Sequence, residues 1–203
     1  MRALLLVDIQ NDFMPFGALP VAGGDEIVPV ANALILRSGL VVATQDWHPV
    51  EHGSFASAHV GASPGDRVLL GGIDQMLWPD HCVQGTPGAS FHSALDVAGI
   101  DRVVRKGSDP AIDSYSGFFD NDHRTATGLG EFLESHAVDE IVVLGLATDY
   151  CVRATVLDAV GLGFGVTLVT DGCRAVDATP GDGDRAIAEM HAAGVRVVES
   201  SHV

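Results

Sequence analysis

Short apolar runs of strand length alternate with helical patterns along the whole chain, and this alternation limits the fold more than any other feature. Six runs are apolar nearly throughout, as strands covered on both faces of a sheet are: residues 3–7, 40–44, 102–105, 140–144, 166–170 and 195–199. Helical patterns occupy residues 25–36, 129–136, 151–160 and 181–193. The sequence therefore predicts a three-layer α/β/α, Rossmann-like fold with a central six-stranded, mainly parallel sheet.

Residues 46–100 do not follow this alternation of strand and helix patterns. They are rich in Gly, Pro and His, and we interpret them as an irregular excursion over one edge of the sheet that carries function. With 203 residues, 47% of them hydrophobic, the chain suffices for one sizeable core. We expect residues 1–203 to form a single domain that includes this excursion.

The charge of the chain excludes some classes of partner. Subtracting 11 basic from 27 acidic residues leaves a net charge of -16, which repels nucleic acid and anionic lipid. The apolar run at the N-terminus stops at Asp8 without a cleavage site, and no stretch approaches the roughly 18 residues that span a bilayer. We expect a cytoplasmic protein with reduced thiols and no nucleic-acid or membrane partner.

Chemically active residues follow four of the predicted strands. Asp8 ends the first strand, Asp46 follows the second, and Lys106, the only lysine, follows the third. A loop after the fourth strand leads to Cys151. Because ligands bind beyond the carboxyl ends of parallel strands, we expect these four residues to share one site.

Histidines in the excursion suggest a metal site near Asp46. Asp46 and His48 lie two residues apart, so in an extended segment their side chains point the same way. A carboxylate with two imidazoles is a common open site for a catalytic divalent metal. The pattern favours Asp46, His48 and a distant His81 as ligands. Six other histidines are interpreted as ordinary exposed side chains: His59, His92, His123, His136, His191 and His202.

Cys151 is the predicted nucleophile. It stands near the start of a predicted helix, where free backbone N–H groups stabilise a thiolate. The ammonium of Lys106 is expected to lower the pKa of both Asp8 and Cys151. The alternative role, a small buried hydrophobic residue, is assigned to Cys82 and Cys173.

Motifs in a fixed order connect these residues to a family. Six segments carry them: Val7–Phe13 (VDIQNDF), Thr44–Pro49 (TQDWHP), Trp78–Gly88 (WPDHCVQGTPG), Lys106–Gly107, Asp113–Phe118 (DSYSGF) and Gly145–Val152 (GLATDYCV). Across nearly its whole length the chain resembles the nicotinamidases, a branch of the isochorismatase-like cysteine hydrolases. The DWH and WPxHC elements distinguish nicotinamidases from metal-free relatives.

The resemblance implies the roles of the polar residues. It implies a catalytic triad of Asp8, Lys106 and Cys151. It also implies one divalent metal ion held by Asp46, His48 and His81, with zinc as the first expectation and iron or manganese as alternatives. His52 matches a position that some members add to the metal shell, and it is a candidate fourth ligand.

The resemblance also implies the substrate contacts. Phe13 and Trp78 would flank a pyridine ring, and the backbone N–H groups of Ala147 and Cys151 would form the oxyanion hole. The peptide bond before Ala147 is often cis in relatives. A role for Tyr115 is less secure, because the loop that precedes it varies in length among members.

The implied activity is the hydrolysis of nicotinamide to nicotinate and ammonia through a cysteine thioester, a step of NAD salvage, with pyrazinamide as a second substrate. A related cysteine amidohydrolase that acts on another small amide would share the triad without needing the metal. A non-enzymatic metal-binding or interaction module is less favoured, because all three triad positions are filled. The expected partner is the small-molecule substrate, and a homo-oligomer remains open.

Overall fold

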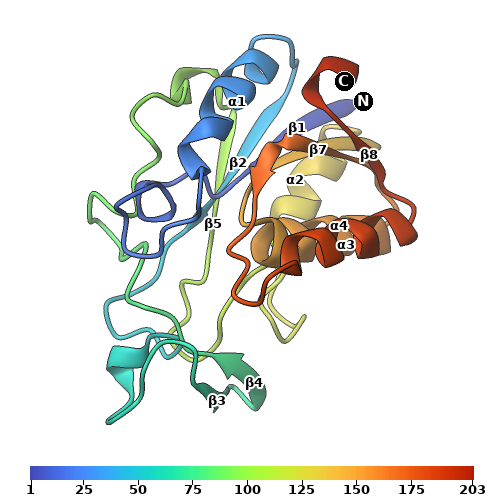
Figure 1. The fold of residues 1–203 in the computed structure, drawn as a ribbon. Coiled ribbons are helices and arrows are strands. Elements are labelled where there is room, and N and C mark those ends of the chain that lie inside the picture. The colour runs from blue at the N-terminus through green and yellow to red at the C-terminus, as the bar shows by residue number, and fades with distance from the viewer.

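A six-stranded parallel sheet forms the centre of the computed structural model, which describes all 203 residues. The strands lie in the order β5-β2-β1-β6-β7-β8, and every neighbouring pair is parallel. Their bounds are Arg2–Val7 (β1), Val41–Asp46 (β2), Arg102–Lys106 (β5), Glu140–Leu146 (β6), Gly165–Arg174 (β7) and Arg196–Val198 (β8). The predicted α/β class and six-stranded sheet are confirmed (Figure 1).

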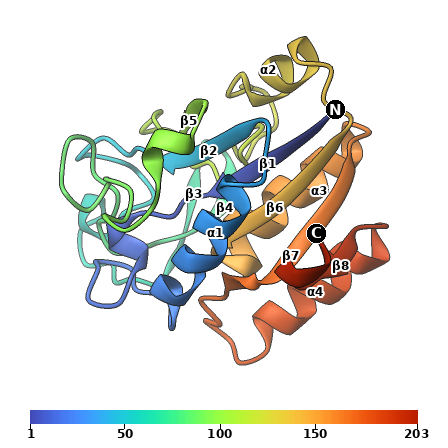
Figure 2. The ribbon, with the colours of Figure 1, turned by 90° about the horizontal axis from the view of Figure 1, so that it is seen from above.

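Helices cover both faces of the sheet. Helix α1 (Val28–Ile35) lies on one face, and α2 (Leu129–Ser135), α3 (Arg153–Gly161) and α4 (Asp182–Ala192) lie on the other (Figure 2). This division follows from right-handed crossovers, because β1 leads through α1 in one direction along the sheet and β6 leads through α3 in the other. The direction reverses between β1 and β6, and such a switch point opens a crevice at the carboxyl ends of the strands.

Several predicted bounds differ from the structure. The helix predicted over residues 25–36 divides into a 3-10 turn at Gly24–Ile27 and α1. The helix predicted from residue 151 begins at Arg153, after a π-helical turn at Thr148–Val152. Strand β7 continues four residues beyond its predicted end, because a register shift lets it pair again with the end of β6. Tertiary pairing, rather than local pattern, sets these bounds.

The excursion at residues 46–100 is more regular than predicted. It contains an antiparallel hairpin of β3 (Arg67–Leu70) and β4 (Ile73–Met76), joined by two glycines at φ 58° and 85°. A two-residue turn with positive φ at both positions suits a hairpin, and glycine adopts it without strain. The hairpin protrudes at one end of the molecule (Figure 1). The prediction missed it because each strand is only four residues long, too short for a clear period, and β4 is half polar.

Short 3-10 turns complete the structure. They lie at Asn11–Phe13, Ala56–Ala58, Val97–Gly99 and Ser200–His202. None of the helices combines the length and the apolar character that crossing a membrane requires.

Candidate active site

The four chemically active residues meet at the switch point of the sheet. Asp8 directly follows β1, Asp46 ends β2, Lys106 ends β5, and Cys151 lies in the π-helical turn after β6. All four are buried. The structure therefore brings together the residues that the sequence places at four separate strand ends.

The Lys106 ammonium lies at the centre of this group. Its Nζ is 3.0 Å from Asp8 Oδ2 and 3.4 Å from Cys151 Sγ, and it also contacts Asp46 Oδ1. A further hydrogen bond of 2.9 Å reaches the carbonyl oxygen of Ser114. Burial lowers the pKa of Lys106, but the carboxylates of Asp46 and Asp8 raise this pKa by a larger amount, so the net shift is well upward. Lys106 is therefore a permanent cation at this site.

Asp8 is held by strand β2. The Thr44 hydroxyl donates to Asp8 Oδ1 at 2.6 Å, and the Asp8 backbone N–H donates to Thr44 Oγ1 at 3.2 Å. Asp8 Oδ2 accepts no directed hydrogen bond within the protein, although the Lys106 ammonium lies beside it. Burial raises the pKa of Asp8, and the opposing effect of Lys106 does not cancel it. Asp8 can therefore accept a proton at Oδ2.

The pKa of Cys151 moves in the direction opposite to the prediction. Burial raises it well above the ordinary value, and the nearby Lys106 ammonium only partly offsets this. Lys106 does lower the pKa of both Asp8 and Cys151, as predicted, but burial raises each pKa by more, so both net shifts are upward. The reason is that both groups lose their water, which disfavours their charged forms more than one cation favours them. The resting thiol is neutral and needs an adjacent base to become a nucleophile.

A second polar group lies on the other side of Asp46. Its Oδ2 is 3.6 Å from His48 Nε2 and 3.9 Å from His81 Nε2. The Nδ1 atoms of the two histidines contact backbone carbonyl oxygens, of Gly107 at 2.8 Å and of Pro79 at 2.7 Å. Because a carbonyl only accepts, each Nδ1 carries the hydrogen and each Nε2 presents its lone pair.

This donor set fits a divalent cation. Three ligand atoms converge at separations too long for hydrogen bonds between them, and backbone carbonyls orient both imidazoles as metal-bound histidines are usually oriented. Asp46 thus joins two groups, since its Oδ1 contacts Lys106 and its Oδ2 faces the histidines. The three residues predicted as metal ligands are together in space.

His52 lies beside this group with a different orientation. Its ring centroid is 4.3 Å from that of His48, but Nε2 is 3.3 Å from the carbonyl oxygen of Ile112 and Nδ1 is 2.7 Å from Ser54 Oγ. Both ring nitrogens are therefore engaged within the protein. The role of His52 as a fourth ligand remains a prediction.

A pocket opens onto Cys151. Phe13, Trp78 and Ala147, the predicted substrate contacts, line it together with the three candidate metal ligands. The peptide bond between Leu146 and Ala147 is cis, as the resemblance implies. The Ala147 carbonyl accepts hydrogen bonds of 3.1 Å from the backbone N–H groups of Tyr150 and Val152.

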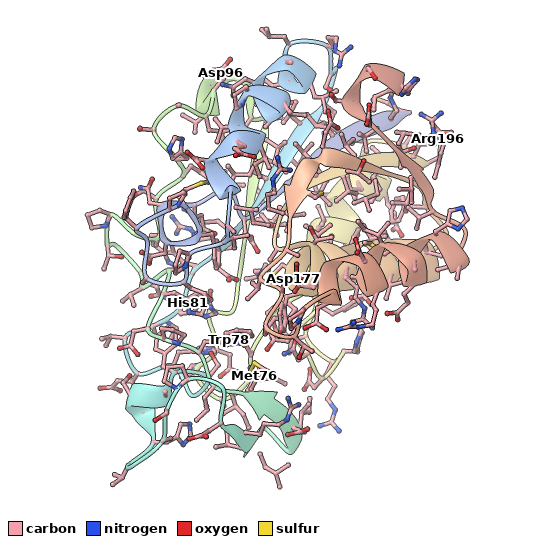
Figure 3. The ribbon with its side chains drawn as sticks, in the orientation of Figure 1. Met76, Trp78, His81, Asp96, Asp177 and Arg196 are labelled. Atoms are coloured by element: carbon pink, nitrogen blue, oxygen red, sulfur yellow. The ribbon has the colours of Figure 1, made fainter.

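Further residues of the pocket were not selected from the sequence. Leu19, Asp113, Tyr150 and Val176 also line it. Asp113 and Tyr150 stand inside motifs quoted above, so their positions were a usable signal, whereas Leu19 and Val176 lie outside every motif. Figure 3 shows Met76, Trp78 and His81 leading from the β3–β4 hairpin toward the sheet. The excursion thus supplies one wall of the pocket.

Comparisons of sequence and of structure find similarity to the same group of proteins. A model of the isochorismatase domain matches residues 2–202. The nicotinamidase of Escherichia coli K12 is 53% identical over 197 residues, which cover 95% of this chain and 92% of that protein. An Acinetobacter nicotinamidase and pyrazinamidase structure has a TM-score of 0.96 at 43% identity, covering 99% of this chain and 97% of that one. The pyrazinamidase of Pyrococcus horikoshii, solved in complex with zinc, has a TM-score of 0.79 at 39% identity and covers 98% of each chain.

Proposed function

This chain belongs to the isochorismatase domain family, and from that premise we propose that it is a metal-dependent amidohydrolase that converts nicotinamide to nicotinate and ammonia. The observation that carries the proposal is the contact of Lys106 with Asp8, Asp46 and Cys151 at the base of a pocket. The relatives named nicotinamidase support the choice of substrate.

The first chemical step forms a covalent bond between enzyme and substrate. Asp8 Oδ2 takes the thiol proton as Cys151 Sγ attacks the amide carbon, and the Lys106 ammonium stabilises the sulfur as it gains negative charge. The backbone N–H groups of Ala147 and Cys151 donate to the oxygen of the tetrahedral adduct. The raised pKa of Asp8 suits this role, because a carboxylate of higher pKa is a stronger base.

The remaining steps release the two products. The protonated Asp8 gives its proton to the amide nitrogen, the C–N bond breaks, and ammonia leaves a thioester on Cys151. Water then attacks the thioester carbon while Asp8 takes a proton from it. Cleavage of the C–S bond, with return of a proton to sulfur, releases nicotinate and restores the thiol.

The metal site and the aromatic residues position the ring. A divalent ion held by Asp46, His48 and His81 would supply a Lewis-acidic contact for the pyridine nitrogen, and zinc is the first candidate. Phe13 and Trp78 flank a flat ring and exclude water from it. Pyrazinamide presents the same ring nitrogen and amide, so we propose it as a second substrate. Nicotinate formation would place the enzyme in NAD salvage.

An ammonia-release assay tests the proposed function. The purified protein is assayed on nicotinamide before and after chelation, and then after addition of zinc, iron(II) or manganese(II). We expect turnover that is lost on chelation and restored by a divalent ion. Turnover that survives verified removal of metal would favour the alternative, a metal-free cysteine amidohydrolase acting on another small amide. Absence of turnover from metal-loaded protein would refute nicotinamide as the substrate.

Metal stoichiometry in two variants tests whether His81 or His52 is a metal ligand. We expect His81→Ala to lower the bound metal, because its Nε2 faces Asp46. For His52→Gln we expect near-normal stoichiometry, because its ring nitrogens are engaged by Ser54 and Ile112. Loss of metal in the second variant would make His52 a ligand.

A further inference from the structure

The β3–β4 hairpin inserts one polar side chain toward the pocket. Gln75 is 3% exposed, whereas its neighbour Asp74 is exposed and pairs with Arg67 at the surface. A buried primary amide is favourable only where its donors and acceptors find partners. The partners of Gln75 belong to the substrate pocket.

The Gln75 amide contacts two residues that line the pocket. Its Nε2 lies 2.9 Å from Asp113 Oδ2, 2.9 Å from the Tyr115 hydroxyl and 2.7 Å from the carbonyl oxygen of Met76. Its Oε1 accepts from Asn121 Nδ2 at 3.3 Å. One amide therefore connects the hairpin to the segment that carries Asp113 and Tyr115.

The Tyr115 hydroxyl is left with a free hydrogen. Trp78 Nε1 donates to it at 3.0 Å, and Gln75 Nε2 lies 2.9 Å away and shares its two hydrogens among this oxygen, Asp113 Oδ2 and the Met76 carbonyl. The hydroxyl donates to no protein group. Burial raises the pKa of Tyr115, so the phenol stays protonated. The two N–H groups beside the oxygen repel its own hydrogen and so restrict where that hydrogen points. The hydrogen bond from Trp78 Nε1 to the Tyr115 hydroxyl also fixes the position of the Trp78 indole.

We propose that Gln75 is a positioning residue for substrate, which acts by orienting the Tyr115 hydroxyl and, through it, the Trp78 indole against the bound ring. This rests on the proposed function, since the ring is that of nicotinamide. Gln75 hydrogen-bonds to neither Cys151 nor the candidate metal ligands, so its contribution is made equally in the ground and transition states. Its loss raises KM and changes kcat little.

Ammonia-release kinetics on nicotinamide, with metal-loaded enzyme, test this proposal. Gln75→Met keeps the length of the side chain and removes its hydrogen bonds. We expect KM to rise about tenfold, the effect of losing one oriented hydrogen bond, while kcat stays within about threefold. Asp74→Asn is the matched control: it weakens a surface ion pair of the same hairpin and should leave KM unchanged. Melting curves establish that each variant is folded.

A double-mutant cycle separates positioning from general support of the fold. In a Tyr115→Phe background, Gln75→Met should change KM by less than about twofold, because the hydroxyl through which it acts is gone. An unchanged KM in the single variant, or an equal increase in both backgrounds, overturns the proposal. If Gln75→Met does not fold, Gln75→Leu, which also removes the hydrogen bonds, serves in the same cycle, and we again expect a raised KM that depends on the hydroxyl.

Equilibrium binding of nicotinate tests the role of Gln75 independently of the proposed nicotinamidase activity. Calorimetry on wild type and Gln75→Met should show the same roughly tenfold weakening as KM. If wild type binds nicotinate but releases no ammonia from nicotinamide, the proposed function fails and the ratio of dissociation constants still decides the role of Gln75. If wild type neither turns over nicotinamide nor binds nicotinate, both proposals are refuted.

Discussion

Substitution of Lys106 tests the charge and the geometry of the active site separately. Its Nζ lies among Asp8 Oδ2 at 3.0 Å, the Ser114 carbonyl at 2.9 Å and Cys151 Sγ at 3.4 Å, and it contacts Asp46. Lys106→Met removes the charge from this buried group. Lys106→Arg keeps the charge but replaces a compact ammonium with a wider planar guanidinium.

The two variants should differ in stability. Lys106→Met leaves two buried carboxylates without their cation, and breaking a buried ion pair costs about 3–5 kcal/mol. For a chain of this size each kcal/mol lowers Tm by roughly 2–4 °C, so we expect Tm to fall by about 6–20 °C. Lys106→Arg retains the cation and should lose less.

Both variants should lose most of their activity. The guanidinium cannot place its charge where Nζ lies without moving Asp8 or the Cys151 sulfur. A displacement of about 1 Å at a reacting centre costs roughly 10²-fold, so kcat/KM of Lys106→Arg should fall by about that factor even though the protein remains folded. Lys106→Met should fall at least as far.

The assay is ammonia release from nicotinamide, with a melting curve for each variant. Arg124→Lys, the reverse exchange at an exposed position, is the control and should match wild type. If Lys106→Arg keeps more than about a third of the wild-type kcat/KM, the compact ammonium is not required. The proposed proton transfer between Cys151 and Asp8 would then need another explanation.

Four further substitutions follow from the site. Cys151→Ala should lower kcat by about 10³-fold or more, whereas Cys173→Ala, at a buried position of β7, should keep a near-normal rate. The reverse result would identify the other thiol as the nucleophile. His81→Ala should raise KM for nicotinamide together with its loss of metal, and a normal KM would show that the metal does not hold the ring. Gly107→Ala should also lower bound metal, because φ at this position is +64° and an added Cβ would lie 2.4 Å from His48 Cε1; elemental analysis at wild-type stoichiometry would contradict this.

The periodic pattern of the sequence was sufficient to predict the sheet. The six runs correspond to the six parallel strands, and the central strands β1, β2 and β6 are buried almost throughout, as apolar strands covered on both faces are. Asp8, Asp46 and Lys106 could be located for the same reason, since each lies within two residues of the end of such a run. The motif order then supplied their roles as expectations.

The sequence was less informative about the excursion. Its strands are too short for a clear period, and β4 is half polar, so the hairpin and the inward orientation of Gln75 were missed. Nor could it orient His52, whose ring nitrogens are directed by Ser54 and Ile112. Such orientations depend on which backbone carbonyls and hydroxyls lie nearby in space, and no local spacing specifies them.

The direction of the Cys151 pKa was also decided only by tertiary structure. The sequence shows a thiol that shares its site with one cation, which argues for a lowered pKa. The folded chain removes water from both Cys151 and Asp8, and this desolvation outweighs the attraction of Lys106. A sequence specifies which charges are present, but burial, which determines how strongly each charged form is disfavoured, exists only after distant strands have packed together.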